Sequence, residues 1–183
     1  MILDTKNFDI LGVKLFSTKS YEDNRGLFSE VYQAKLDHPE FKIEYVQENE
    51  SISNYGIFRG MHLQKDSHSQ SKLIRVVKGK VIDVVCDLRK SSTSFKKNIF
   101  IELNPNQLLF LPKGLAHGFL SLEEGTVLNY KCDNYYNQSS ESGFNLFKSK
   151  IEIDFPIESN DIIMSYKDKS LPRLDNSYIY ENL

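Results

Sequence analysis

The residues most able to do chemistry lie in the segment 56–64. It places Arg59, His62 and Gln64 within six positions of a strand-like stretch. Successive side chains of a strand point to opposite faces, so His62 and Gln64 are expected to share one face. Gly60 could bulge the strand and re-aim its neighbours. A histidine presented in this way can serve as a base or as a metal ligand.

A second segment, residues 111–119, contains the spacing Pro-x-Gly-x-x-His and ends near His117. This spacing resembles the second conserved motif of the cupins. In metal-binding cupins, the first motif supplies two histidines one residue apart and then a glutamate. Here Gln64 stands where the second histidine would be, and no glutamate follows at the required distance. His62 and His117 without a carboxylate make a poor divalent site, so we expect a cupin-like pocket without a metal.

Short strands are the elements expected to position these segments. Turn signals rich in Asn, Gly and Pro recur at short intervals. The runs between them are rich in β-branched and aromatic residues and cover residues 27–32, 73–77, 80–87, 98–103 and 126–132. Many short strands at even spacing indicate an all-β sandwich or barrel. Helical signal is weak, with short turns expected at 33–36 and near 165–169, before Pro172.

Two carboxylates share one face of the run at 80–87. Asp83 and Asp87 alternate there with Val81 and Val85, whereas the other face is uniformly apolar. Side chains of a strand alternate in this way between two environments. We therefore expect the face that carries the carboxylates to look into a wet cavity or a polar rim.

Length and composition are those of one ordinary domain spanning residues 1–183, with 40% hydrophobic and 26% charged residues. A net charge of −2 gives no general attraction to nucleic acid or to an anionic membrane, so neither is expected as a partner. The first residues lack the pattern of a signal peptide, and no apolar run approaches a membrane span, which predicts a cytoplasmic location. Cys86 and Cys132 are expected to be buried, reduced thiols.

Motifs spread in order over nearly the whole chain resemble those of the dTDP-4-dehydrorhamnose 3,5-epimerases. They are Asp23-Asn24-Arg25-Gly26-x-Phe28-x-Glu30, Gln47-x-Asn49-x-Ser51, Arg59-Gly60-x-His62-x-Gln64, residues 72–79, 83–89 and 112–119, Tyr130-Lys131, Tyr135-Tyr136 and Ser165-Tyr166-Lys167-Asp168. The resemblance implies a cupin-like double-stranded β-helix, or jelly roll, with a small C-terminal helical appendage. It also implies a homodimer with N-terminal strand exchange, for which the stretch from Phe8 to Phe16 would be suited.

Epimerising a carbon beside a ketone requires a base, a group that stabilises the enolate, and a proton donor on the opposite face. By resemblance, His62 is the base and is paired with Asp168, which orients the ring and stabilises the imidazolium. Lys72 stabilises the enolate oxygen, and Tyr130 returns a proton from the other side. This set uses no cofactor and no metal.

The resemblance also implies contacts with a nucleotide-diphosphate 4-keto sugar. Arg25 and Arg59 would hold the diphosphate. The other implied contacts line the nucleotide cleft or meet the nucleotide or sugar: Phe28, Glu30, Gln47, Asn49, His117, Tyr136 and Glu141. Residues 142–150 depart from the Trp-Asn-Asp-Pro-like stretch usual in the family, and we expect them to touch the cleft or its rim.

Three classes of function are compared on this basis. The leading hypothesis is an isomerase of the dTDP-L-rhamnose type of deoxysugar biosynthesis, which inverts C3 and C5 of dTDP-4-dehydro-6-deoxyglucose. Relatives that invert one carbon share the same base and acid, so a single-carbon epimerase of another nucleotide 4-keto sugar is an open alternative. Gln64 and the missing glutamate disfavour a metal-dependent cupin oxygenase. The retained base, lysine and tyrosine disfavour a non-catalytic binding module.

Overall fold

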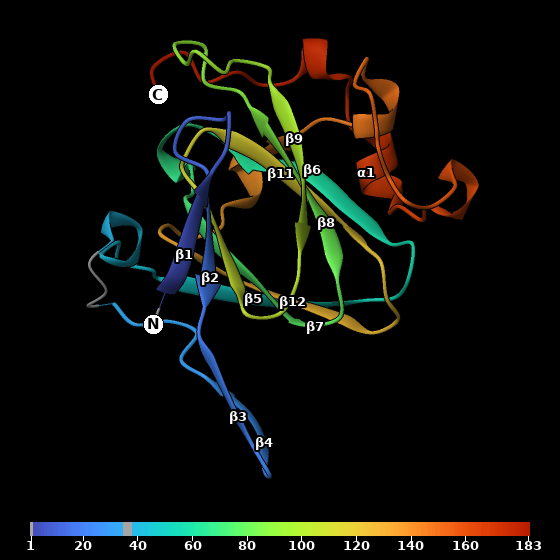
Figure 1. The fold of residues 1–183 in the computed structure, drawn as a ribbon. Helices are drawn as coiled ribbons and strands as arrows, with labels where there is room; N and C mark the ends of the chain where they lie inside the picture. Colours follow the sequence, from blue (N-terminus) through green and yellow to red (C-terminus); the bar gives the residue numbers. More distant parts are fainter. Residues whose placement is uncertain (1, 35–37) are drawn as a thin grey trace.

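Two antiparallel sheets form the body of the computed structural model, which describes residues 2–34 and 38–183 (Figure 1). In spatial order, the six-stranded sheet contains β1 (Ile2–Asn7), β2 (Lys14–Thr18), β10 (Gln107–Leu111), β7 (Lys72–Lys78), β12 (Thr126–Cys132) and β5 (Gln47–Ser53). The five-stranded sheet contains β13 (Glu141–Gly143), β6 (Phe58–Gln64), β11 (Leu115–Ser121), β8 (Val81–Asp87) and β9 (Asn98–Leu103). From β5 to β8 and from β9 to β13, successive strands alternate between the sheets. This winding confirms the predicted all-β jelly roll.

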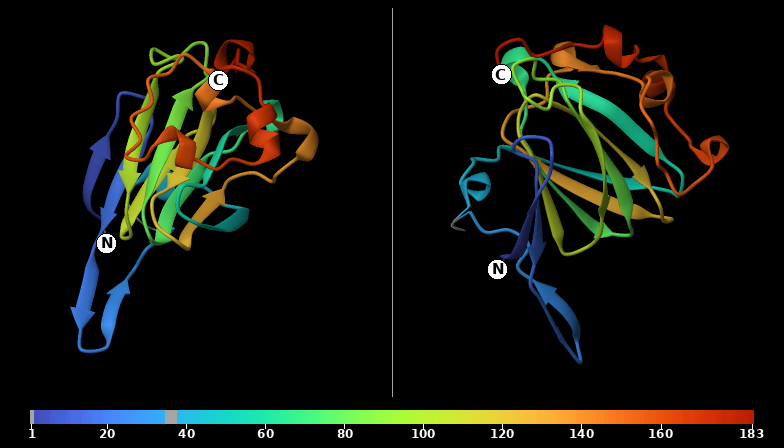
Figure 2. Two further views of the ribbon diagram at one scale, coloured as in Figure 1. Left: turned by 90° about the vertical axis from the view of Figure 1, so that its right-hand side faces the viewer. Right: turned by 45° about the horizontal axis from the view of Figure 1, so that its top comes forward.

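A hairpin of β3 (Ser20–Asp23) and β4 (Gly26–Ser29) projects away from the two sheets (Figures 1 and 2). The strand predicted at 27–32 is therefore shorter than expected. Beyond Ser29 the chain returns to the barrel, where Tyr32 packs against an apolar cluster on the outer face of the six-stranded sheet. The other four predicted strands correspond to β7, β8, β9 and β12.

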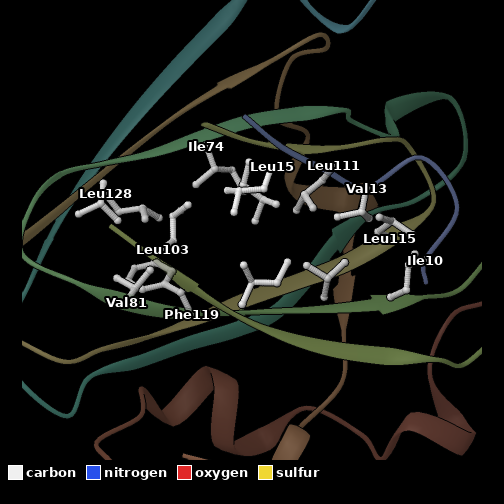
Figure 3. Close-up of a cluster of buried hydrophobic side chains, with 14 residues drawn as sticks. Ile10, Val13, Leu15, Ile74, Val81, Leu103, Leu111, Leu115, Phe119 and Leu128 are labelled. Carbon is white, nitrogen blue, oxygen red and sulfur yellow. The ribbon is translucent and has the colours of Figure 1, made fainter. Parts of the chain in front are cut away.

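The main core lies between the sheets. It consists of inward-facing aliphatic and aromatic side chains, of which Figure 3 labels Ile10, Val13, Leu15, Ile74, Val81, Leu103, Leu111, Leu115, Phe119 and Leu128. Each such side chain stabilises the fold by about 1.5–3 kcal/mol when fully buried. Tyr130 packs against this core from β12. The strands that carry polar residues at the barrel interior are thereby held in fixed register.

The C-terminal segment covers the outer face of the five-stranded sheet, where Val84, Cys86 and Leu120 pack against Phe144 and Leu146. Its only α-helix among the described residues is α1 (Tyr166–Ser170), which confirms the turn predicted near 165–169. The 3-10 helices are η1 (Pro39–Phe41), η2 (Asp66–His68), η3 (Gln138–Ser140), η4 (Leu146–Lys148), η5 (Ser159–Asp161) and η6 (Leu174–Asn176). No helix in the described part of the chain is long and apolar enough to cross a membrane. Residues 35 and 36 of the turn predicted at 33–36 lie outside the described residues.

The face of β8 that carries Asp83 and Asp87 is buried, so the prediction that it meets a wet cavity or polar rim is wrong. Both carboxylates are fully inaccessible. Val81 and Val85, on the same face, belong to the core between the sheets. Asp87 tolerates this burial because Arg89 and two serine hydroxyls donate hydrogen bonds to it. The uniformly apolar character of the other face is confirmed by its packing beneath the C-terminal segment.

The two cysteines form no disulfide. Cys86 lies among the residues beneath the C-terminal segment, and Cys132 ends β12. Both are fully buried and free, as predicted.

Candidate active site

A cavity of about 680 Å³ is lined by residues of both sheets and of the segment around α1. Ten of the predicted site residues line it: Gln47, Asn49, Arg59, His62, Lys72, His117, Tyr130, Tyr136, Glu141 and Asp168. The structure thus brings together side chains that are up to 121 positions apart in the sequence, from Gln47 to Asp168.

The six-stranded sheet supplies one wall through the register of three neighbouring strands. On β12, Tyr130 lies opposite Asn49 of β5, and Cys132 lies opposite both Gln47 of β5 and Lys72 of β7. Residues directly opposite each other in an antiparallel pair point to the same face. Alternation along β12 and β5 then turns all four polar side chains into the barrel.

The five-stranded sheet supplies the other wall, where His62 of β6 lies opposite His117 of β11. The register shifts after this pair, since Arg59 lies opposite Phe119. Gly60 occupies the shifted step with φ +132°, a conformation that side chains rarely adopt, and an added Cβ would meet Gly118. The predicted bulge at Gly60 is therefore confirmed. It lets Arg59 and His62 line the same cavity although strict alternation would separate them.

His62 forms a hydrogen-bonded pair with Asp168, with 2.7 Å between Nε2 and Oδ1. The His62 side chain is 34% exposed, whereas that of Asp168 is 5% exposed. The Ser165 hydroxyl accepts a hydrogen bond from the Asp168 amide at 3.0 Å and so fixes the start of α1. Burial acts to raise the pKa of Asp168, but the hydrogen bonds from His62 and Gly60 outweigh it and hold that pKa below its ordinary value. An ionised carboxylate therefore lies beside a histidine that faces the cavity.

His117 forms a second pair, with 2.8 Å between its Nε2 and Oδ2 of Asp83. Both side chains are buried, at 9% and 0% exposure. Burial lowers the pKa of His117 despite the nearby carboxylate, and burial raises the pKa of Asp83 despite the nearby imidazole. The His117 ring is therefore favoured in its neutral form, which presents it to a ligand as a hydrogen-bonding group rather than as a cation.

Lys72 and Tyr130 lie together on the wall that faces the histidines, with the ammonium 5.7 Å from the centre of the phenol ring. Burial lowers the pKa of Lys72. Burial also raises the pKa of Tyr130, so its hydroxyl keeps its proton at neutral pH. Within residues 2–34 and 38–183, neither the ammonium nor the phenol hydroxyl makes a hydrogen bond. Both groups are free to meet a ligand in the cavity.

The rim of the cavity is polar and internally bonded. Glu141 accepts hydrogen bonds from the Tyr136 hydroxyl, at 2.8 Å, and from the Lys167 ammonium. The side-chain oxygen of Gln47 accepts a hydrogen bond from the Tyr136 backbone amide at 2.8 Å. Arg59 is exposed and donates to the Ser53 hydroxyl at 3.0 Å, which aims its guanidinium along the edge of the cavity. These groups match the needs of a charged, hydrogen-bonding ligand such as a nucleotide diphosphate.

Comparison with known proteins decides the family. The model of the family described as dTDP-4-dehydrorhamnose 3,5-epimerase matches residues 7–176. The chain belongs to this family. The Escherichia coli K12 epimerase of that name is 36% identical over 171 residues, which cover 91% of this chain and 92% of the relative.

Solved structures of the same family superpose closely on this chain. The crystal structure of the epimerase from Elizabethkingia anophelis has 37% identity and a TM-score of 0.87, and the match covers 96% of this chain and 98% of the other. The Legionella pneumophila epimerase, solved in complex with dTDP-4-keto-L-rhamnose, has 32% identity and a TM-score of 0.90, with 98% of each chain covered. The fold and the family predicted from the motifs are thereby confirmed.

Several lining residues were not predicted. The polar ones are Ser51, Gln70, Ser165 and Lys167, with Gln64 lining the cavity as well. Ser51 continues the alternation of Gln47 and Asn49, and Lys167 directly precedes Asp168, so both signals were present in the family motifs. The apolar lining includes Ile57, Phe58, Leu63, Phe119, Ile163 and Met164, which no local pattern distinguishes from core residues.

Arg25, Phe28 and Glu30 do not line this cavity. Arg25 pairs with Asp23 at the tip of the projecting hairpin, and Phe28 is 69% exposed. Arg25 and Phe28 lie on the β3–β4 hairpin and Glu30 directly follows it, and this hairpin projects away from the two sheets (Figure 2).

Residues 142–150 do not line the cavity either, so the prediction that they touch it or its rim is wrong. Phe144 and Leu146 are fully buried beneath the five-stranded sheet instead. Their apolar side chains are stabilised by removal from water in that layer.

Gln64 stands at the position of a metal-binding histidine in other cupins and is buried. Its side-chain oxygen accepts a hydrogen bond from the Asn137 backbone amide at 2.9 Å. Its side-chain oxygen therefore orders the loop that leads to the rim. Among the described residues, no group of three or more His, Cys, Asp or Glu side chains is placed to hold a metal ion.

Proposed function

We propose that this chain inverts C3 and C5 of dTDP-4-dehydro-6-deoxyglucose, the rhamno-forming step of dTDP-L-rhamnose-type deoxysugar biosynthesis. The observation that carries the proposal is the placement of the His62–Asp168 pair and Tyr130 on facing walls of one cavity. Base and acid can then act on opposite faces of a sugar held between the sheets. Membership of the family supports the substrate class.

In the first step, His62 takes the proton from the carbon next to the C4 ketone. Asp168 accepts the hydrogen bond of Nε2–H, which leaves Nδ1 as the unprotonated nitrogen. The imidazolium that forms is stabilised by the ionised Asp168, which is buried and held by Ser165 and Gly60. The carboxylate thus fixes both the tautomer and the orientation of the ring.

The electron pair of the broken C–H bond moves onto the C4 oxygen and forms an enolate. Lys72 stabilises this oxygen, because an ammonium inside a barrel interacts more strongly with a developing anion than it would in water. Tyr130 then gives its hydroxyl proton to the opposite face of the carbon, and the configuration is inverted. The His62 imidazolium then releases its proton to solvent and the Tyr130 phenolate takes one up from solvent. Repetition at the second carbon completes the double epimerisation.

The polar rim binds the nucleotide diphosphate. Arg59 contacts the diphosphate, and His117 contacts the sugar with its neutral ring. The nucleotide is held by Gln47, Asn49, Tyr136 and Glu141. All four line the cavity, and hydrogen bonds join Tyr136 to Gln47 and to Glu141.

The protein acts as a homodimer in this proposal. Arg25 and Phe28 lie on the β3–β4 hairpin that projects from its own barrel, and Glu30 directly follows it, so their contact with substrate requires the cavity of a second copy. The exchanged segment is then the β3–β4 hairpin and not the stretch from Phe8 to Phe16, because Ile10 and Phe16 are fully buried in their own chain.

A dimer of this kind predicts a mass near twice 21.2 kDa in solution. Arg25→Ala is expected to raise KM about tenfold with little change in kcat, because one charge-assisted contact to the diphosphate is lost. Sedimentation and steady-state kinetics measure both effects. A monomeric protein with full activity would contradict the exchange.

Incubation with dTDP-4-dehydro-6-deoxyglucose in deuterated water tests the function. The expected product is the rhamno isomer with deuterium at C3 and C5. Label at one carbon alone would make the protein a single-carbon epimerase, which has the same base and acid. Binding without turnover across several 4-keto sugar nucleotides would make it a binding module.

A further inference from the structure

Asp168, the partner of His62, lies on a helix that is very short. α1 spans only the five residues Tyr166–Ser170. The Asp168 and Lys169 carbonyl groups are among its last four, which have no partner within an α-helix. An isolated helix shorter than about 12 residues is marginal in water. The position of the Asp168 carboxylate therefore depends on the groups outside α1 that bind its two ends.

The buried side chain of Asn145 binds the end of α1. Its Nδ2 donates to the Asp168 carbonyl at 3.1 Å and to the Lys169 carbonyl at 3.3 Å. Its Oδ1 accepts a hydrogen bond from the Lys148 backbone amide at 3.0 Å, which makes Asn145 the N-cap of η4. Only 3% of Asn145 is exposed. A side-chain amide can donate two hydrogen bonds while it accepts another, which neither serine nor aspartate can do.

The same segment is also bonded to the strand that carries His62. Phe144 exchanges two backbone hydrogen bonds with Met61, at 3.1 and 3.2 Å, and Met61 directly precedes His62 on β6. The backbone amide of Asn145 donates to the Pro172 carbonyl at 2.7 Å, beyond the end of α1. Residues 144 and 145 therefore join the strand of His62 to the helix of its partner carboxylate.

We propose that Asn145 is a positioning residue that holds the Asp168 carboxylate within hydrogen-bonding distance of His62. The inference rests on the proposed function, in which Asp168 keeps the proton of the neutral His62 ring on Nε2. The two partners are 106 positions apart in the chain, so bonds between segments must set their distance of 2.7 Å. Asn145 lies outside the cavity and acts through Asp168.

Asn145→Ser separates this role from the role of Asn145 as a cap. Serine is a good N-cap and can keep the hydrogen bond to the Lys148 amide. Its side chain is one atom shorter, so the donors to α1 are lost. The value of kcat is expected to fall about 10- to 100-fold, because a displacement of about 1 Å at a catalytic group can have an effect of this size. KM should stay within about twofold, and steady-state kinetics measure both.

The tautomer of His62 gives a second measurement, which needs no substrate. It is read from the ¹⁵N NMR signals of the imidazole nitrogens at about pH 8, where an ordinary histidine is neutral. In the unmodified protein the proton should lie on Nε2, whose partner is Asp168. In Asn145→Ser a mixture of the two tautomers is expected. A side chain that only stabilised the fold would lower the Tm and leave the tautomer unchanged.

Ser149→Ala is the matched control. The Ser149 hydroxyl donates to the Asn145 carbonyl at 2.7 Å and accepts a hydrogen bond from the Leu174 amide at 2.9 Å. Both bonds belong to the same layer as those of Asn145, but neither reaches α1. This variant should unfold at a lower temperature than the unmodified protein. Its kcat should stay within about twofold of the unmodified value, and the His62 proton should remain on Nε2.

If Asn145→Ser fails to fold, Asn145→Asp takes its place, because it keeps the shape and the cap but cannot donate to α1. An unchanged tautomer and an unchanged kcat in a folded variant of this kind overturn the inference. So does an equal change in Ser149→Ala, which would trace the effect to general loosening of the C-terminal layer. Failure of the proposed function is distinguishable, because the unmodified protein would then show no turnover while the tautomer of His62 still responded to Asn145→Ser.

Discussion

The two histidine–carboxylate pairs of this barrel use the same chemical groups in different environments. His62 and His117 lie opposite each other on neighbouring strands, and each contacts an aspartate through Nε2. His62 is partly exposed, and the pKa of its partner Asp168 is held below the ordinary value. His117 is buried, and the pKa of its partner Asp83 is raised. Depth and the number of donors to the carboxylate therefore decide which pair can carry a proton and which supports the cavity.

His62→Ala should have the largest effect on this comparison. Loss of the base is expected to lower kcat about 10³- to 10⁴-fold, because general base catalysis contributes a factor of that order. Rates of product formation measure the loss, and circular dichroism checks the fold. His68→Ala, in η2 and outside the cavity, is the control and should keep full activity.

Asp168→Asn comes next, with an expected fall in kcat of about 10²- to 10³-fold. The amide of the new asparagine can donate to Nε2 of His62 and so favour the tautomer with a proton on Nδ1. In that tautomer Nδ1 can no longer accept a proton from the substrate. KM should change little, since Asp168 acts behind His62. An Asp168→Asn variant as active as the unmodified protein would show that the carboxylate does not set the tautomer.

His117→Ala should lower kcat less than His62→Ala does but should lower the free energy of unfolding more. The fall in kcat is expected to be about tenfold, whereas the free energy of unfolding should fall by about 3 kcal/mol because Asp83 is left buried without a partner. His62→Ala should cost only about 1 kcal/mol, since Asp168 keeps its contact with Gly60. Urea unfolding of both variants checks the order. Equal losses of stability would contradict the difference in environment.

The smallest expected effect is on the pH dependence of the free energy of unfolding, to which Asp168 and Asp83 should contribute with opposite signs. Asp168 has a lowered pKa, so its contribution is present above the unfolded value of about 3.9 and is lost as the pH falls through its folded pKa. Asp83 has a raised pKa, so its contribution is present below about 3.9 and is lost as the pH rises through its folded pKa. Between about pH 3 and pH 7, the free energy of unfolding should decrease less on acidification in Asp168→Asn than in the unmodified protein. It should decrease more in Asp83→Asn. If both variants changed the pH dependence of the free energy of unfolding in the same direction, the proposed difference between Asp168 and Asp83 would be wrong.

The same comparison explains what the sequence could predict. The short runs rich in β-branched and aromatic residues predicted β7, β8, β9 and β12, and the family motifs predicted ten of the residues that line the cavity. Alternation on β8 placed Asp83 and Asp87 on one face but held no information on depth, because the groups that bury Asp83 belong to distant strands. Its partner His117 is 34 positions away.

The sequence also could not tell which cavity the hairpin residues serve. Arg25 and Phe28 match a binding motif, but a motif does not say whether its own barrel or that of another copy lies within reach. Likewise, Phe144 and Leu146 lie within five positions of a cavity residue, Glu141, yet both are buried in the layer beneath the sheet because they are apolar. These outcomes depend on packing between distant segments.

Exchange of the substrate's C3 and C5 hydrogens in deuterated water, followed by NMR in His62→Ala and His117→Ala, tests the central claim most directly. With His62 as the base, exchange at both carbons should be lost in His62→Ala and should persist, more slowly, in His117→Ala. Exchange at the unmodified rate in His62→Ala, or its complete loss only in His117→Ala, would contradict the assignment of the two pairs.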